Sequence, residues 1–158
     1  MAELSKNKKR TMSKTLNQII SRLNVIANKH YFINRYGFGE LSDIDVAGPE
    51  DVDYPLMWVV PQGADFDENT LTYVLRVIIM DIDDLDDSKR NEIMSDTLRT
   101  LIDVVKQFKT DDDYEWNIDE TTNAIPFSQR FVDYTTGWYA DIRIITDLDN
   151  NPCSIASN

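Results

Sequence analysis

The chain has 158 residues, which is enough for one ordinary domain. Of these residues, 42% are hydrophobic and 28% are charged, a composition typical of a protein that folds around a core. Its 28 Asp and Glu residues outnumber 16 Lys and Arg residues, and the formal net charge of −12 excludes a protein that coats nucleic acid through surplus cations. A single cysteine, Cys153, excludes an internal disulfide, and a single histidine, His30, leaves few ways to build a zinc site or a histidine-based catalytic site.

The N-terminal segment is strongly basic, and the rest of the chain is acidic. Residues 1–35 contain eight Lys or Arg and one acid, Glu3, whereas the other 123 residues contain 8 basic and 27 acidic residues. No apolar run follows the basic start, and the longest apolar segments are too short to span a bilayer. We therefore expect a soluble protein made in a reducing cytoplasm, with residues 1–12 as a flexible basic arm.

The first predicted element is a helix over residues 13–28. Thr11 or Ser13 is the expected N-cap. Gly, Pro and Asp in residues 37–55 then predict a long loop. The helix is predicted because apolar residues recur at three-and-four spacing: Leu16, Ile19, Ile20, Leu23, Ile26 and Ala27.

Two strands should follow this loop. Residues 55–61 (PLMWVVP) form a short apolar run between prolines, and polar residues 62–69 suit a hairpin connection. Residues 70–81 alternate as a strand whose two faces both become apolar toward its C-terminal end. Such a strand lies at the centre of a sandwich or is covered by a second protein.

A second helix of about twenty residues is predicted from Ser88, ending before the acidic run 111–113. Strands are expected over residues 114–118 and 126–134, and Gly137 should mark the turn before a final strand. The sequence thus predicts one α+β domain over residues 13–146, an antiparallel sheet packed by two helices, followed by a polar extended tail over 147–158.

Two acidic runs invite a metal-site interpretation. Counted from Asp81, acids stand at positions one, three, seven and twelve of a calcium-type loop, but Leu85 and Asp86 occupy positions five and six. A solvated turn that begins the second helix is the favoured alternative to a weak cation site. In the run Asp147, Asp149, Asn151, a proline stands where the glycine should be.

No catalytic or cofactor motif emerges from the remaining candidates. His30 follows the first helix, where a satisfied, partly buried side chain or a helix-end cation is favoured over catalysis. The GFG at residues 37–39 lacks the preceding strand and third glycine of a dinucleotide fingerprint. Trp58, Trp116 and Trp138 could stack a ligand, but their strand-like contexts favour a core or subunit interface. We expect no enzyme activity, no catalytic residue, no metal and no cofactor.

Several stretches resemble a known family: INRYGFGELSDID at 33–45, PLMWVVP at 55–61, the strand, acidic turn and helix LTYVLRVIIMDIDDLDDSKRNEIMSDTLRTLIDVV, and TTGWYADIRI at 135–144. With the order of elements, they make the chain similar to the tail terminator (tail completion) family of tailed-bacteriophage necks. The similarity covers most of the chain after about residue 12. The basic arm has no match in the family.

This resemblance implies a structural virion protein, a ring at the head–tail junction that ends the tail tube or joins it to the connector. It implies a homo-oligomer, a hexamer or alternatively a dodecamer, that contacts other neck, connector or tail proteins. DNA would pass through the channel without sequence-specific binding, and an acidic wall would repel its phosphates. The expected location is the virion, after synthesis in the host bacterial cytoplasm, with no membrane contact.

Exposed-aromatic and charge arguments then give candidate interface residues. The arm of one copy could lie on the acidic body of its neighbour. Two alternatives are a monomeric acidic adaptor or inhibitor that binds a basic protein partner, and an enzyme with a carboxylate metal site. The candidate interface residues are Lys6, Lys8, Lys9 and Arg10 of the arm and the aromatics Tyr36, Phe38, Trp58 and Trp138.

Overall fold

The computed structural model describes residues 15–46, 53–83, 88–110, 117–130 and 134–148. These residues form helices and one six-stranded sheet, so the chain is an α+β protein. The strand order is β1-β2-β3-β6-β4, and β5 pairs with β6 beside β4. The elements are α1 (Leu16–Lys29), β1 (Arg35–Phe38), α2 (Leu41–Val46), β2 (Leu56–Phe66), β3 (Thr70–Ile82), α3 (Arg90–Lys109), β4 (Asn117–Ile118), β5 (Ala124–Arg130) and β6 (Thr135–Asp147).

The sheet is mixed, which corrects the prediction of an antiparallel one. β1 runs parallel to β2 in the register Arg35↔Leu56 to Phe38↔Val59, while every other pair is antiparallel. Parallel neighbours need a crossover of a dozen or more residues, and residues 39–55 supply it. This crossover contains α2, a third helix in the region that the sequence predicts as a loop.

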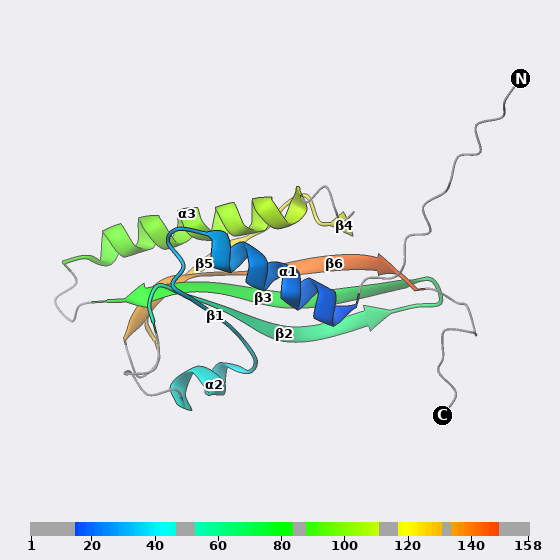
Figure 1. The fold of residues 1–158 in the computed structure, drawn as a ribbon, viewed down its shortest axis with the longest axis horizontal. Helices are drawn as coiled ribbons and strands as arrows, with labels where there is room; N and C mark the ends of the chain where they lie inside the picture. Colours follow the sequence, from blue (N-terminus) through cyan, green and yellow to red (C-terminus); the bar gives the residue numbers. More distant parts are fainter. Residues whose placement is uncertain (1–14, 47–52, 84–87, 111–116, 131–133, 149–158) are drawn as a thin grey trace, which may run out of the picture.

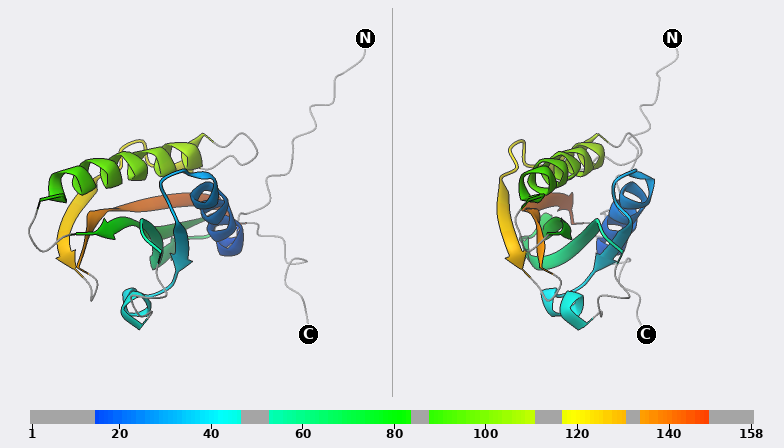
Figure 2. Two further views of the ribbon diagram at one scale, coloured as in Figure 1. Left: turned by 60° about the vertical axis from the view of Figure 1, so that its left-hand side comes forward. Right: turned by 90° about the vertical axis from the view of Figure 1, so that its left-hand side faces the viewer.

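The main core lies between one face of the sheet and the two longer helices. Figures 1 and 2 show α1 and α3 on the same side of the sheet, with α2 on the other side. The buried face of each helix follows its apolar spacing, as predicted. This core contains Ile19, Leu23 and Ile26 of α1, Leu101, Val104 and Phe108 of α3, and Met57, Val59, Leu75, Val77, Ile79, Ala140, Ile142 and Ile144 of the sheet.

A second, smaller cluster explains why β3 is apolar on both faces. Ile78 and Met80 point away from the main core, and Ile44 of α2 packs against them together with Leu56 and Val60 of β2. Phe127 and Tyr139 lie at the margin of this cluster. The chain's own elements therefore cover the second face at this end of β3, with no need of another protein.

The first helix begins later than predicted. Thr15 is its N-cap, and a capping box closes the end because Thr15 Oγ1 accepts from Gln18 N while Gln18 Oε1 accepts from Thr15 N. The expected caps, Thr11 and Ser13, lie outside the described residues. Helix α3 matches its prediction within two residues at its start.

The hairpin of β2 and β3 is longer than predicted. β2 continues through Pro61, with an irregular register between Pro61 and Gly63, and ends at Phe66. A proline is tolerated there because β1 pairs only as far as Val59, so that beyond Val60 β2 forms the edge of the sheet. The chain turns through residues 67–69, which are exposed. The hairpin thus extends past the region that α2 covers.

Gly137 lies inside β6, not in a turn before it. It pairs with Met80, and a Cβ at this position would overlap the backbone carbonyl oxygen of Ile79. β6 also runs to Asp147, where Leu148 N donates to Asn69 O. The strands expected over 114–118 and 126–134 are described as β4 and β5, with residues 114–116 and 131–133 outside the described chain.

Candidate functional site

The two candidate aromatics of β1 pack on the molecule's own main core. Tyr36 is half-buried and its hydroxyl donates to the Ile20 carbonyl at 3.2 Å, and burial raises the pKa of the Tyr36 phenol. Phe38 is also half-buried against the same core. Tyr36 therefore ties β1 to α1, and Phe38 packs on the main core.

Trp58 lies on the other face of the sheet, over the glycines of the GFG segment. Its Nε1 donates to the Gly39 carbonyl at 3.2 Å, and a Cβ on Gly37 would overlap the indole ring. This contact gives the segment a packing role: Gly37 leaves the space that the indole fills.

Trp138 lies on β6 at the margin of the main core, three strands from β1 in the sheet order. Its Nε1 donates to the Met94 carbonyl of α3 at 2.9 Å. The structure thus does not bring the four aromatics together into one patch. The basic candidates Lys6, Lys8, Lys9 and Arg10, and Trp116, lie outside the described residues.

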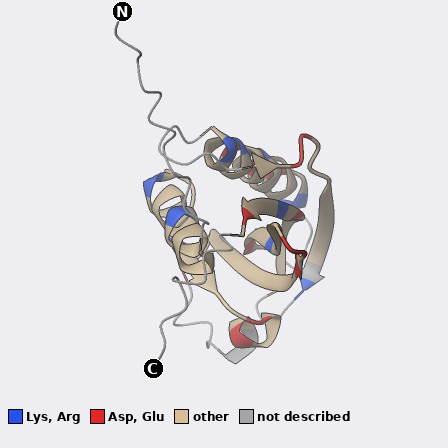
Figure 3. Cartoon of the chain, turned by 90° about the vertical axis from the view of Figure 1, so that its right-hand side faces the viewer, with Lys and Arg blue, Asp and Glu red and all other residues tan. Residues whose placement is uncertain are grey.

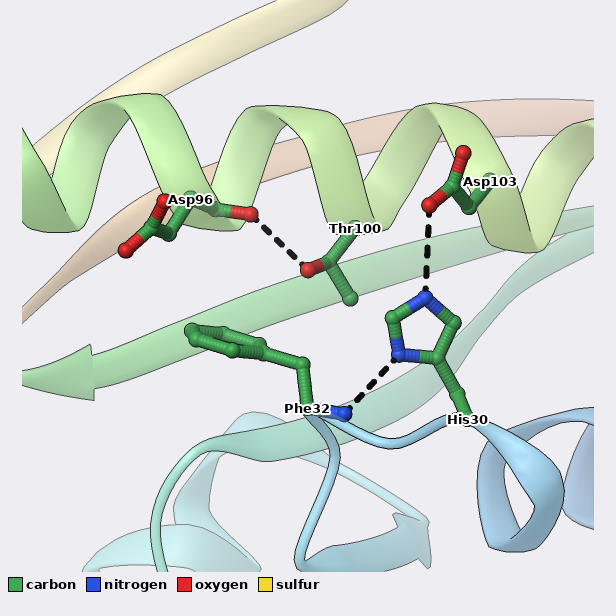
Figure 4. A network of polar contacts seen from close by, with 5 residues as sticks. All are labelled: His30, Phe32, Asp96, Thr100 and Asp103. Carbon is green, nitrogen blue, oxygen red and sulfur yellow. Dashed lines mark hydrogen bonds and ion pairs between the residues drawn. The ribbon is translucent and has the colours of Figure 1, made fainter.

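His30 occupies a satisfied, buried position that ties α1 to α3 (Figure 4). It is the C-cap of α1, its Nδ1 accepts from Phe32 N at 3.2 Å, and its Nε2 lies 3.4 Å from Asp103 Oδ2. Since Nδ1 is an acceptor, Nε2 carries the proton and donates to the carboxylate. The hydroxyl of Thr100, on the same face of α3, donates to the Asp96 carbonyl at 2.8 Å. Both ring nitrogens therefore have structural partners.

Asp83, in the acidic turn, binds groups of its own chain. Its buried carboxylate lies 2.9 Å from Arg90 Nε at the start of α3 and accepts from Thr136 Oγ1 of β6 at 2.8 Å. Burial and the nearby Asp96 raise the pKa of Asp81, although the Ile82 amide, which donates to its carboxylate, opposes the shift. Asp84 and residues 85–87 lie outside the described chain, and in the described part no three acidic, His or Cys side chains gather around a metal position.

The segments at the two ends of the strand order, β1 with α1 beside it and the residues after β4, differ in charge. At the β1 edge, the described residues 15–38 include Arg22, Lys29 and Arg35 and no acid. At the far edge, residues 117–123 include Asp119 and Glu120 and no cation. In Figure 3, blue marks Lys and Arg positions along the ribbon of α1, and red marks acidic positions on the segment that leads into β5. Lys29 and Arg35 thus lie in or beside one edge strand and Asp119 and Glu120 beside the other, while the distal half of β2 adds Asp65 to the first edge.

An apolar cleft of about 170 Å³ lies between α3 and the β5–β6 edge. Leu101, Ile102 and Val105 of α3 form one wall, and Ala124 and Ala140 form the other. Ile102, on the wall formed by α3, is 43% exposed. At one end of the cleft stand the side chains of Lys106, Lys109 and Thr122.

A second opening, of about 410 Å³, is polar and lies at the same edge. It is lined by Ile118 of β4, by Asp119 and residues 121–123 of the following segment, and by the facing part of β6, including Asp141 and Arg143. Lys109 reaches across this segment and donates to the Glu120 carbonyl and to Thr122 Oγ1. The acidic edge therefore combines a polar hollow with an apolar one.

The hairpin end presents an aromatic side chain that the sequence analysis passed over. Phe66 is 79% exposed, at the point where β2 turns toward β3. The turn is ordered because Asp67 Oδ1 accepts from Asn69 N and Thr70 N, and the Asn69 amide is the largest cause of the lowered pKa of Asp67. An aromatic residue within the acidic run ADFDEN was the available signal. The cleft had none, because residues far apart in sequence form it.

No protein-family model matches the chain, and a search of curated proteins finds no matching sequence. Among the described helices, none combines the length and apolar character that crossing a membrane requires.

Proposed function

We propose that this chain is a structural subunit of a tailed bacteriophage that assembles into a ring at the head–tail junction. There it would end the tail tube or join it to the connector. The resemblance of residues 33–45, 55–61 and 135–144 to tail terminator proteins suggests the setting. One observation on the folded chain supports the ring itself: the cations Lys29 and Arg35 lie in or beside the edge strand β1, and the acids Asp119 and Glu120 follow β4 at the opposite edge.

A ring of identical subunits uses two different surfaces of each copy, which must be complementary to one another. The β1 edge, with Lys29 and Arg35, and the β4 edge, with Asp119 and Glu120, meet this requirement electrostatically. The charge pattern therefore favours head-to-tail contacts, which close into a ring when the rotation between subunits allows it.

The proposed ring has six copies, with twelve as the alternative, and contacts neck, connector or tail proteins at its two faces. The acidic excess of residues 36–158 suits a channel through which DNA slides without binding, because a negative wall repels phosphates. In this proposal the chain acts through assembly, and no residue performs catalysis.

Light scattering of the purified chain at low and high salt tests the ring. We expect a mass of six or twelve copies at low salt and a smaller mass at high salt, because salt screens exposed charges. A chain that stays monomeric at every concentration and salt contradicts self-assembly and favours the acidic adaptor alternative.

A charge-swap experiment tests the head-to-tail arrangement. Variant A carries Lys29→Glu and Arg35→Glu, so both of its edges are negative, and variant B carries Asp119→Lys and Glu120→Lys, so both are positive. Each variant alone should lose assembly by about tenfold or more, and an equimolar mixture should restore rings in which the two alternate. Circular dichroism controls for folding. If the mixture assembles no better than either variant, the edges are not the contact.

A further inference from the structure

We propose that the β2–β3 hairpin of one copy inserts Phe66 into the apolar cleft between α3 and β5 of the next copy. This contact rests on the proposed function, because it is one part of the ring interface. Its partner is a second copy of the same chain, and each copy supplies one hairpin and one cleft.

The hairpin lies on the correct side of the molecule for this contact. Because β1 pairs with β2 only up to Val59, the distal half of β2 continues the same sheet edge that β1 begins. The cleft lies on the opposite edge, against β5 and β6. The hairpin and the cleft thus belong to the two edges that a head-to-tail contact brings together. Because they lie on opposite edges, the hairpin of one copy would enter the cleft of another copy and not its own.

The cleft has the size and the character of a phenyl-ring site. Its volume is about 170 Å³, and an apolar protein cavity of roughly 150 Å³ is known to bind benzene. Leu101, Ile102 and Val105 would contact the ring from α3, with Ala124 and Ala140 beneath it. Insertion would bury the Phe66 ring, 79% of which is now exposed, together with the exposed part of Ile102.

The charges around the two surfaces are complementary. Asp65, Asp67 and Glu68 flank Phe66, whereas Lys106 and Lys109 stand at the end of the cleft. These opposite charges would attract the hairpin of one copy to the cleft of the next.

The hairpin is also prepared for insertion. The Asp67 carboxylate holds the turn through Asn69 N and Thr70 N at 2.8 and 2.7 Å, and Asp67 N donates to Thr70 O at 3.0 Å. Leu148 N fastens the turn to the end of β6 through Asn69 O at 2.7 Å. An ordered hairpin loses little conformational entropy on binding, which favours its use as an anchor.

Disulfide trapping tests the contact directly. In a Cys153→Ser background, Phe66→Cys and Ile102→Cys are prepared as single variants and combined in one chain. After mild oxidation, the double variant should give a ladder of covalent oligomers on a denaturing gel, ending at the size of the ring. A mixture of the two single variants should give dimers only, and each single variant alone should give none. A dimer from Phe66→Cys alone would mean that hairpins meet each other, and would overturn the proposal.

Phe66→Ala provides an independent measurement, with Ile82→Ala, which removes a 50% exposed apolar side chain at the end of the central strand β3, as the control. Light scattering should show assembly weakened about tenfold or more by Phe66→Ala and unchanged by Ile82→Ala. A normal ring that neither Phe66→Ala nor trapping affects overturns the contact and leaves the ring standing. A ladder that grows without closing supports the contact and contradicts the ring. A monomeric wild-type chain without a ladder overturns both.

Discussion

Arg76 of β3 and Asp141 of β6 are direct cross-strand partners, and their side chains form a two-pronged ion pair on the sheet face opposite the main core. Arg76 Nε lies 2.8 Å from Asp141 Oδ1, and Arg76 Nη2 lies 3.0 Å from Asp141 Oδ2. The guanidinium also lies 4.3 Å from the centre of the Tyr139 ring. The hydrogen bond to Asp141 raises the pKa of Arg76, while partial burial opposes the shift. The cross-strand pairing, the ion pair and the contact with the Tyr139 ring therefore all fix the position of the Arg76 side chain.

This geometry predicts a measurable coupling between Arg76 and Asp141. A double-mutant cycle with Arg76→Ala and Asp141→Ala should give about 0.5–1 kcal/mol from urea unfolding, reduced at high salt because Asp141 is partly exposed. The neighbouring Arg143–Asp65 pair is the control, since its side chains are 46% and 73% exposed and its coupling should be near zero. Equal coupling energies in the two pairs would contradict the expectation that the two-pronged geometry of the Arg76–Asp141 pair strengthens it.

The contacts of His30 predict its tautomer. Because Nδ1 accepts from Phe32 N, the proton should reside on Nε2, and nitrogen NMR shifts of the imidazole should report this form at neutral pH. His30→Ala should lower the free energy of unfolding by about 1–3 kcal/mol, because it removes a buried side chain and the acceptor of the Phe32 amide. Asp103→Asn keeps an acceptor and should change stability much less. A proton found on Nδ1 would contradict the assignment.

Asp81→Asn should stabilise the fold at neutral pH. Burial and the Asp96 charge raise the pKa of Asp81 in the folded state, so the folded chain holds this proton more tightly than the unfolded chain. Stability therefore falls as the pH rises from the ordinary aspartate range through the raised pKa, and the penalty persists at pH 7. Asparagine retains the oxygen that accepts from Ile82 N.

Urea unfolding of the Asp81→Asn and wild-type chains at several pH values provides the measurement. Their difference should be largest near pH 7 and disappear below about pH 3, where an aspartate is protonated in both states. Asp96→Asn should produce part of the same gain, because it removes one of the causes of the shift. A gain that does not vary with pH would rule out titration of Asp81 as the origin.

Gly137→Ala should destabilise the chain by more than about 3 kcal/mol or prevent folding, because the new methyl group would overlap the Ile79 carbonyl oxygen in the neighbouring strand. Gly37→Ala is the comparison, since its methyl group would meet the Trp58 ring. That side chain can rotate, so the second variant should fold and show altered tryptophan fluorescence. Thermal melts separate the two results, and an unchanged melting temperature for Gly137→Ala would refute the close approach.

The basic arm supplies a prediction from charge alone. Replacing Lys6, Lys8, Lys9 and Arg10 with Glu should weaken ring assembly, and more so at low salt, because the acidic body would then repel the arm. Light scattering of this variant beside the wild-type chain measures the effect. Unchanged ring formation would refute a role for the arm.

Local patterns in the sequence determined most of the regular structure. The apolar spacing of residues 16–27 and 93–108 identified the two long helices, and the alternation from Leu71 to Ile79 identified the central strand. These signals work because a helix or strand buries a face whose period is written in its own residues.

Only the tertiary structure decided the rest, because those features depend on residues distant in sequence. The parallel pairing of β1, the cover of α2 over Ile78 and Met80, and the place of Gly137 against Ile79 all follow from how the chain crosses itself. The same holds for the α3–β5 cleft. The sequence alone revealed a basic segment and an acidic body, but strand order placed Arg35 of β1 at one edge of the sheet and Asp119 and Glu120, after β4, at the other, since no local pattern specifies which strands become neighbours.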